Sequence, residues 1–195
     1  CSSDLISRMI NLKKYTKACV FASMMCVCGL VQAQTSTVEG WDFQTEYLRH
    51  NKSDKHVDNY NLHVYTHLWN NDYLSLYGGG IATIADGYMD REERNNSDAV
   101  GIGPSVMARL EFNPFGNFYA GLEAAGSMRF FTKAHPAGGR CYDFLWQVGP
   151  RLSYKFGNYT AVGISAYYAH ASNGMNSHNP GYEMKGLALD VEYKF

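Results

Sequence analysis

The sequence contains few prolines and, beyond its first 33 residues, almost no cysteine. Of its 195 residues five are Pro and five are Cys, and four of these cysteines precede residue 34. Cys141 would stand alone once that segment is removed, so no disulfide framework and no Cys-rich metal site are expected. Long apolar runs are also missing after Val38, where apolar and polar residues alternate. The aromatic content of 14% and the 19 glycines favour strands and tight turns over helices.

The first 33 residues have the layout of a secretory signal peptide. Three lysines follow Met9, a short apolar run spans 18–30, and small residues mark a cleavage site after Ala33. The apolar run is shorter than the roughly 20 residues that a membrane-spanning helix needs. We therefore expect 1–33 to be an extension upstream of Met9 plus a cleaved signal peptide, and 34–195 to form the exported domain.

Removal of this leader makes the remaining charge negative. The leader holds Arg8, three lysines and Asp4, so 13 of the 17 basic and 17 of the 18 acidic residues remain, a net charge of about −4. No basic stripe is left that would bind nucleic acid. A lipoprotein signal ending at Cys26 or Cys28 is the alternative for the leader, but the flanking Met and Val residues fit it poorly.

The alternating pattern predicts eight strands joined by connections of alternating length. The expected strands are 38–50, 58–69, 72–85, 99–113, 117–131, 140–156, 158–171 and 182–195. Tight turns are expected at 70–71, 114–116 and 157, and longer loops at 51–57, 86–98, 132–139 and 172–181. Short turns on one rim and long loops on the other predict an all-β, antiparallel, up-and-down barrel.

Each predicted strand has one apolar and one polar face, and either face could point inward. A soluble lipid carrier would turn the apolar face in, whereas a transmembrane barrel turns it out and pairs charges in its interior. The membrane alternative is favoured because aromatic residues cluster at strand ends and the charged face holds both signs. The C-terminal Tyr193-Lys194-Phe195 also resembles the terminal aromatic signal of bacterial outer-membrane barrels. With Phe195 on the periplasmic side, every long loop is external.

Polar residues interrupt the outward-facing rows at one end of the last hairpin. The rows of the seventh and eighth predicted strands continue to His170, Ser172 and Glu183, where polar groups in contact with lipid are costly. We expect Ser172 to attack an ester carbonyl, His170 to take its proton and Glu183 to orient His170. His178 in the following loop is an alternative base. Elsewhere, interior hydrogen bonding is favoured over metal binding for His63 and His67.

This segment resembles the active site of the outer-membrane lipid A 3-O-deacylases, the PagL family. The matching residues are His170, Ser172, Asn173, Asn179, Gly181 and Glu183, although the loop is a residue shorter than in that pattern. The resemblance implies a Ser-His-Glu triad that removes the 3-linked acyl chain of lipid A at the outer leaflet, without metal or cofactor. An oxyanion hole is also needed, for which Asn173, Gly174 and Asn179 are candidates. Lys185 is a candidate contact for lipid A phosphates, and ordinary snorkelling of its ammonium group toward water is the alternative.

A second class of function fits the same fold. The alternative to a lipid A esterase is a non-enzymatic outer-membrane barrel with a structural or ligand-binding role, and loss of activity in Ser172→Ala would separate the two. Expected partners are lipopolysaccharide and outer-membrane lipids, and the sequence leaves open whether the barrel forms a homodimer.

Overall fold

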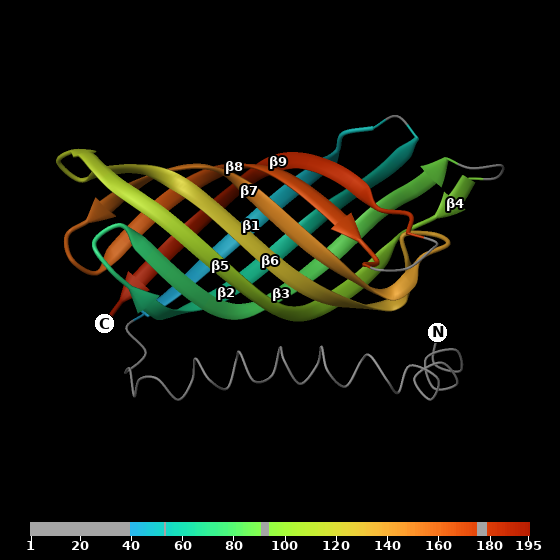
Figure 1. Cartoon of the computed structure of the whole chain (residues 1–195), viewed down its shortest axis with the longest axis horizontal. Coiled ribbons are helices and arrows are strands. Elements are labelled where there is room, and N and C mark those ends of the chain that lie inside the picture. The colour runs from blue at the N-terminus through green and yellow to red at the C-terminus, as the bar shows by residue number, and fades with distance from the viewer. Residues whose placement is uncertain (1–39, 53, 91–93, 175–178) are drawn as a thin grey trace. The chain divides into compact units, whose positions relative to one another are not determined.

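The computed structural model describes residues 40–195 except 53, 91–93 and 175–178. In this part of the chain the secondary structure consists of strands and turns (Figure 1). The strands are β1 (Gly40–His50), β2 (Lys55–Asn70), β3 (Leu74–Asp90), β4 (Arg94–Asn96), β5 (Ala99–Phe115), β6 (Phe118–His135), β7 (Arg140–Phe156), β8 (Thr160–Ser172) and β9 (Tyr182–Lys194).

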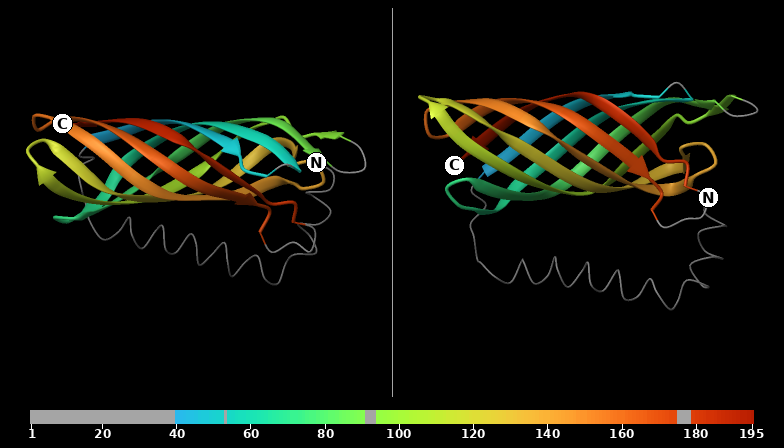
Figure 2. Two further views of the ribbon diagram at one scale, coloured as in Figure 1. Left: turned by 90° about the horizontal axis from the view of Figure 1, so that it is seen from above. Right: turned by 45° about the horizontal axis from the view of Figure 1, so that its top comes forward.

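Eight long strands close into an antiparallel barrel. Neighbours in the sheet follow the order β2-β1-β9-β8-β7-β6-β5-β3, and pairing between β2 and β3 closes the ring. The short strand β4 pairs only with the end of β3, where the two project beyond the barrel (Figure 2). The predicted eight-stranded up-and-down barrel is therefore confirmed. Closure leaves each long strand with two hydrogen-bonded neighbours.

The strands reach further into the predicted long loops than the sequence pattern indicated. β2 already begins at Lys55, β3 continues to Asp90 and β6 continues to His135. Polar residues dominate these extensions, so hydrophobic alternation gives no sign of a strand there. The extensions of β2 and β3 nevertheless pair, because each has a neighbouring strand that supplies the complementary amide and carbonyl groups, whereas in the β6 extension the ladder resumes only at His135, opposite Arg140.

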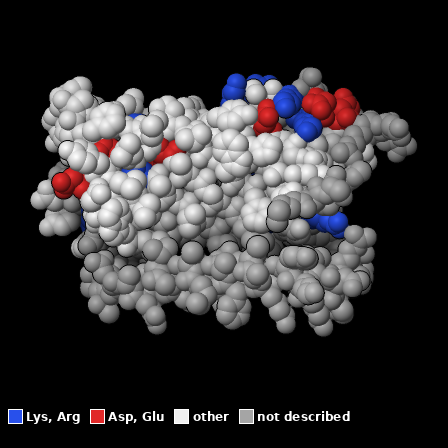
Figure 3. All heavy atoms as spheres, in the orientation of Figure 1, with Lys and Arg blue, Asp and Glu red and all other residues white. Residues whose placement is uncertain are grey.

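On most of the long strands the polar face points inward and the apolar face points outward. Arg109, Arg129 and Asp143 are fully buried, whereas Leu152 and Ile102 are 61% and 65% exposed. Figure 3 shows a largely uncharged wall, with charged side chains toward its two ends. A soluble carrier with an apolar lumen is thus excluded, and the arrangement is that of a transmembrane barrel. None of the described residues forms a helix long and apolar enough to cross a membrane.

Ion pairs fill the half of the barrel nearest to the start of β1 and the end of β9. The guanidinium of Arg109 lies 2.9 Å from Asp42, 2.6 Å from Glu123 and 3.3 Å from Glu192. Arg151 pairs with Asp190 in the same region. The charges neutralise one another inside the wall, because an unpaired buried charge would cost several kcal/mol, roughly 3–5.

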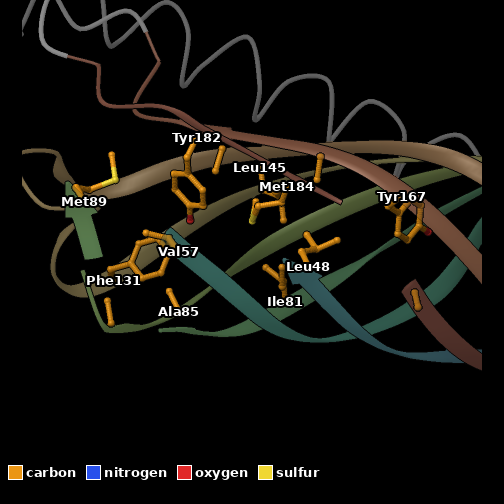
Figure 4. Close-up of a cluster of buried hydrophobic side chains, with 14 residues drawn as sticks. Leu48, Val57, Ile81, Ala85, Met89, Phe131, Leu145, Tyr167, Tyr182 and Met184 are labelled. Carbon is orange, nitrogen blue, oxygen red and sulfur yellow. The ribbon is translucent and has the colours of Figure 1, made fainter. Parts of the chain in front are cut away.

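An apolar cluster fills part of the interior toward the opposite end. Figure 4 shows Leu48, Leu145, Tyr182 and Met184 among the side chains that converge there. Tyr182 and Met184 are at most 1% exposed and lie on either side of Glu183 in the sequence. The cluster therefore anchors the beginning of β9 from within.

Pro104 and Pro150 lie within β5 and β7. The β5–β6 and β7–β8 registers are the same on both sides of these prolines, so no bulge accompanies them. The ladder only skips the positions at which proline lacks a donor.

Candidate active site

The end of β8 presents His170 and Ser172 on the outer wall. Ala169 and Ala171, which alternate with them, are fully buried in the barrel interior. Because successive side chains of a strand point to opposite faces, these alanines fix the outward direction of both polar residues. His170 and Ser172 are themselves half-buried against neighbouring strands.

Glu183 reaches the same place from β9. It is the direct register partner of His170, and its neighbours in the sequence, Tyr182 and Met184, are buried inside the barrel. Opposed residues of an antiparallel pair have Cβ atoms about 4.5–5.5 Å apart. The three residues of the predicted triad thus meet on one patch of the wall, at the end of the barrel opposite to Phe195.

Gly181 packs against both His170 and Ser172. A Cβ atom added at Gly181 would lie 3.2 Å from Cβ of Ser172 and 3.3 Å from Cε1 of His170. The absence of a side chain lets the strand that carries Glu183 approach β8 closely. Its carbonyl oxygen accepts a hydrogen bond from Nζ of Lys55, which fixes this backbone from a third strand.

The candidate oxyanion donors lie at the two ends of the β8–β9 loop and bond to each other. The backbone N–H of Asn173 donates to Oδ1 of Asn179 at 2.9 Å, and Nδ2 of Asn179 donates to the carbonyl of Gly174 at 3.1 Å. The Asn173 side chain is buried and donates to the carbonyls of His135 and Tyr142. Asn173 therefore ties the serine end of β8 to the β6–β7 connection. A substrate oxygen that accepts a hydrogen bond from one of these donors would have to replace its present acceptor, either Oδ1 of Asn179 or the carbonyl of Gly174.

Three residues that the sequence interpretation missed also surround Glu183. Nζ of Lys52 lies 3.2 Å from Oε2 of Glu183, and Lys55 holds Gly181 as described. The Tyr168 hydroxyl, on the outward row of β8, also hydrogen-bonds the Glu183 carboxylate. No hydrogen bond joins Ser172 Oγ, His170 and Glu183 to one another within the described residues. The predicted topology could have indicated Lys52. In a closed barrel β1 pairs with β9, so the connection between β1 and β2 lies next to Glu183 at the start of β9.

An aromatic wall flanks the other side of the site. Trp146 on β7 is the register partner of His170, with ring centroids 5.8 Å apart, and Phe144 is the partner of Ser172. Both aromatic residues are more than 40% exposed on the outer wall. The site is therefore open to apolar material on the side of β7 and cationic on the side of β1 and β2.

The remaining predicted residues divide between this patch and the interior. Lys185 is exposed on β9, two residues from Glu183 on the same face, and His178 lies outside the described residues. His63 bonds to Tyr65 and His67 to Glu192 inside the barrel, which confirms interior hydrogen bonding. Among the described residues no group of three or more His, Cys, Asp or Glu is placed to hold a metal ion.

Comparison with known proteins identifies the fold. No family model matches the sequence, and no curated protein does so. Among solved structures, the crystal structure of the outer membrane enzyme PagL matches with a TM-score of 0.52 over 76% of this chain and 97% of that chain. The barrel has the PagL fold. At 19% sequence identity the likeness concerns the backbone.

Proposed function

We propose that the protein is an outer-membrane serine esterase that removes an ester-linked acyl chain, at the 3-position, from lipid A. The single observation that supports this most is the meeting of His170, Ser172 and Glu183 on the lipid-facing wall of a PagL-like barrel. A polar triad on such a wall is costly unless it serves a reaction. An ester of a membrane lipid is the substrate that this position would meet.

Acylation begins with the serine hydroxyl. Oγ of Ser172 attacks the carbonyl carbon of the ester while its proton passes to His170, and Glu183 stabilises the imidazolium that forms. The negative oxygen of the tetrahedral intermediate takes a hydrogen bond from Asn173, Gly174 or Asn179. The intermediate collapses when His170 gives the proton to the departing sugar oxygen. An acyl-serine and the alcohol result.

Deacylation repeats the sequence with water as the nucleophile. His170 takes a proton from the water that attacks the acyl-serine, and then returns it to Oγ of Ser172 as the fatty acid leaves. Trp146 and Phe144 border the site on the β7 side and would lie alongside the acyl chain. The chain thus stays in apolar surroundings through both steps.

Hydrolysis of a long-chain ester in detergent micelles by the refolded barrel tests the proposal. Wild type is expected to release fatty acid, and Ser172→Ala is expected to lose about 10⁴-fold or more of this activity. Ser165→Ala is the matched control, because Ser165 lies on the same strand with its side chain buried inside the barrel. Equal activity in wild type and Ser172→Ala, with both barrels folded, would favour the non-enzymatic alternative.

A further inference from the structure

Two cations lie opposite each other on the outer wall beside the candidate site. Arg49 on β1 and Lys185 on β9 are register partners, and both are exposed. Their side chains project from the same face as Glu183, which is two residues from Lys185 and about 6.6–7 Å away along the strand. We call Arg49 and Lys185 the cationic pair.

Neither Arg49 nor Lys185 forms an ion pair within the described residues. Two acids lie on the same face, and both are held by other groups: Glu183 by Lys52 at 3.2 Å, and Asp58 on β2 by Nδ1 of His50 at 2.6 Å and the Tyr47 hydroxyl at 2.8 Å. Like charges directly opposite each other on neighbouring strands destabilise a sheet. The next register pair along the wall is Tyr47 and Leu187, so the cations border an apolar surface. An anion between the two side chains would relieve the repulsion between them.

We propose that the cationic pair binds a phosphate group of the lipid substrate and so aligns its ester with Ser172. A guanidinium offers two parallel donors to phosphate oxygens, and an ammonium offers a compact charge. The anion is assigned to a lipid because the pair lies on the wall that faces the membrane. This inference rests on the proposed function for the identity of the lipid. The aromatic residues on the β7 side and the cations on the β1 side would then hold opposite ends of one amphiphile.

Binding of phosphorylated and dephosphorylated lipid A tests this inference. All binding measurements use the folded Ser172→Ala protein in detergent micelles, so that the lipid is not hydrolysed. This single variant is expected to bind bisphosphorylated lipid A more tightly than the same lipid without phosphates. Adding Arg49→Gln and Lys185→Gln is expected to weaken binding of the phosphorylated lipid roughly tenfold or more, without affecting the dephosphorylated one. An equal effect on both lipids, or none, would overturn the proposal.

Two further variants separate a binding effect from a folding effect. Lys194→Gln removes a cation from the other end of β9 and is expected to leave both affinities unchanged. The double variant Arg49→Lys, Lys185→Arg exchanges the two side chains and keeps both charges. It is expected to retain most of the preference for phosphorylated lipid. Loss of that preference in the exchanged barrel, once its heat-modifiable migration shows that it is folded, contradicts recognition by charge.

The same binding assay shows whether the bound phosphate belongs to a lipid or is free. Together with an activity measurement, it also separates failure of the cationic pair from failure of the proposed function. Inorganic phosphate that competes as tightly as bisphosphorylated lipid A would overturn the assignment to a lipid. Fatty acid release by the protein with Ser172 intact is measured separately. If no lipid is hydrolysed, the proposed function fails, while a phosphate-dependent affinity still supports the cationic pair. If hydrolysis occurs with equal affinity for both lipids, only the cationic pair is refuted.

Discussion

His170 and Glu183 are register partners across β8 and β9, with both side chains on the outer wall of the barrel. The interior side chains that alternate with them, Ala169, Ala171, Tyr182 and Met184, are at most 1% exposed and hold the two strands in this register. A base and its orienting carboxylate are thereby built on rigid strands. Ser172, two residues from His170, completes a compact group that needs no large rearrangement to act.

The partnership predicts that Glu183→Gln will lower activity roughly 10²- to 10⁴-fold without unfolding the barrel. The amide keeps the size of the side chain but cannot stabilise the imidazolium of His170. Fatty acid release at saturating substrate measures the effect. Glu111→Gln serves as a control for loss of a carboxylate, since Glu111 pairs with Arg151 far from the site. Full activity of Glu183→Gln would remove Glu183 from the triad.

Gly181→Ala is predicted to lower kcat/KM by about tenfold. The new methyl group would lie 3.0 Å from the carbonyl oxygen of Ala171 and 3.2–3.3 Å from Ser172 and His170, so this end of β8 must shift by a few tenths of an ångström, and misplaced reacting groups are costly. Gly126→Ala on the wall of β6 is the matched control, because a Cβ atom there meets nothing within 4 Å. Wild-type kinetics for Gly181→Ala would show that this contact does not position the site.

The interior ion pairs lead to a prediction for stability. Nε and Nη2 of Arg129 each donate to a different oxygen of Asp143 at 2.8 Å, and both residues are fully buried. Arg129→Leu leaves the carboxylate buried without a partner and is expected to cost about 3–5 kcal/mol of unfolding free energy. The double variant with Asp143→Leu should recover most of this loss. Urea unfolding followed by tryptophan fluorescence in micelles measures both, and a double variant less stable than either single one would contradict the account.

The sequence predicted the barrel and its two faces because strand periodicity carries that information. Arg151 and Leu152 are neighbours in the chain, and the alternation placed them on opposite faces. The aromatic strand ends, the mixed charges of the polar face and the C-terminal Tyr193-Lys194-Phe195 then indicated which face points to the interior. The positions of strand ends were harder to predict, since polar residues such as His56 and Asp86 continue the ladder without a hydrophobic signal. The extra length depends on a partner strand rather than on the residues themselves.

The candidate site was predicted only in part for a similar reason. His170, Ser172 and Glu183 lie in one hairpin, where spacing and facing can be followed along the chain. Lys52 lies in the β1–β2 connection and Lys55 at the start of β2, both more than a hundred residues away in sequence, and they reach the site only because the barrel closes. Close packing at Gly181 is likewise a property of the assembled sheet.

Mass spectrometry of lipid A from cells that express the wild type or Ser172→Ala tests the central claim most directly. The account predicts that one hydroxyacyl chain, that of the 3-position, is lost only in cells with the wild type, while both barrels fold in the outer membrane. Identical lipid A from both strains, together with no ester hydrolysis by either protein in detergent, would contradict it.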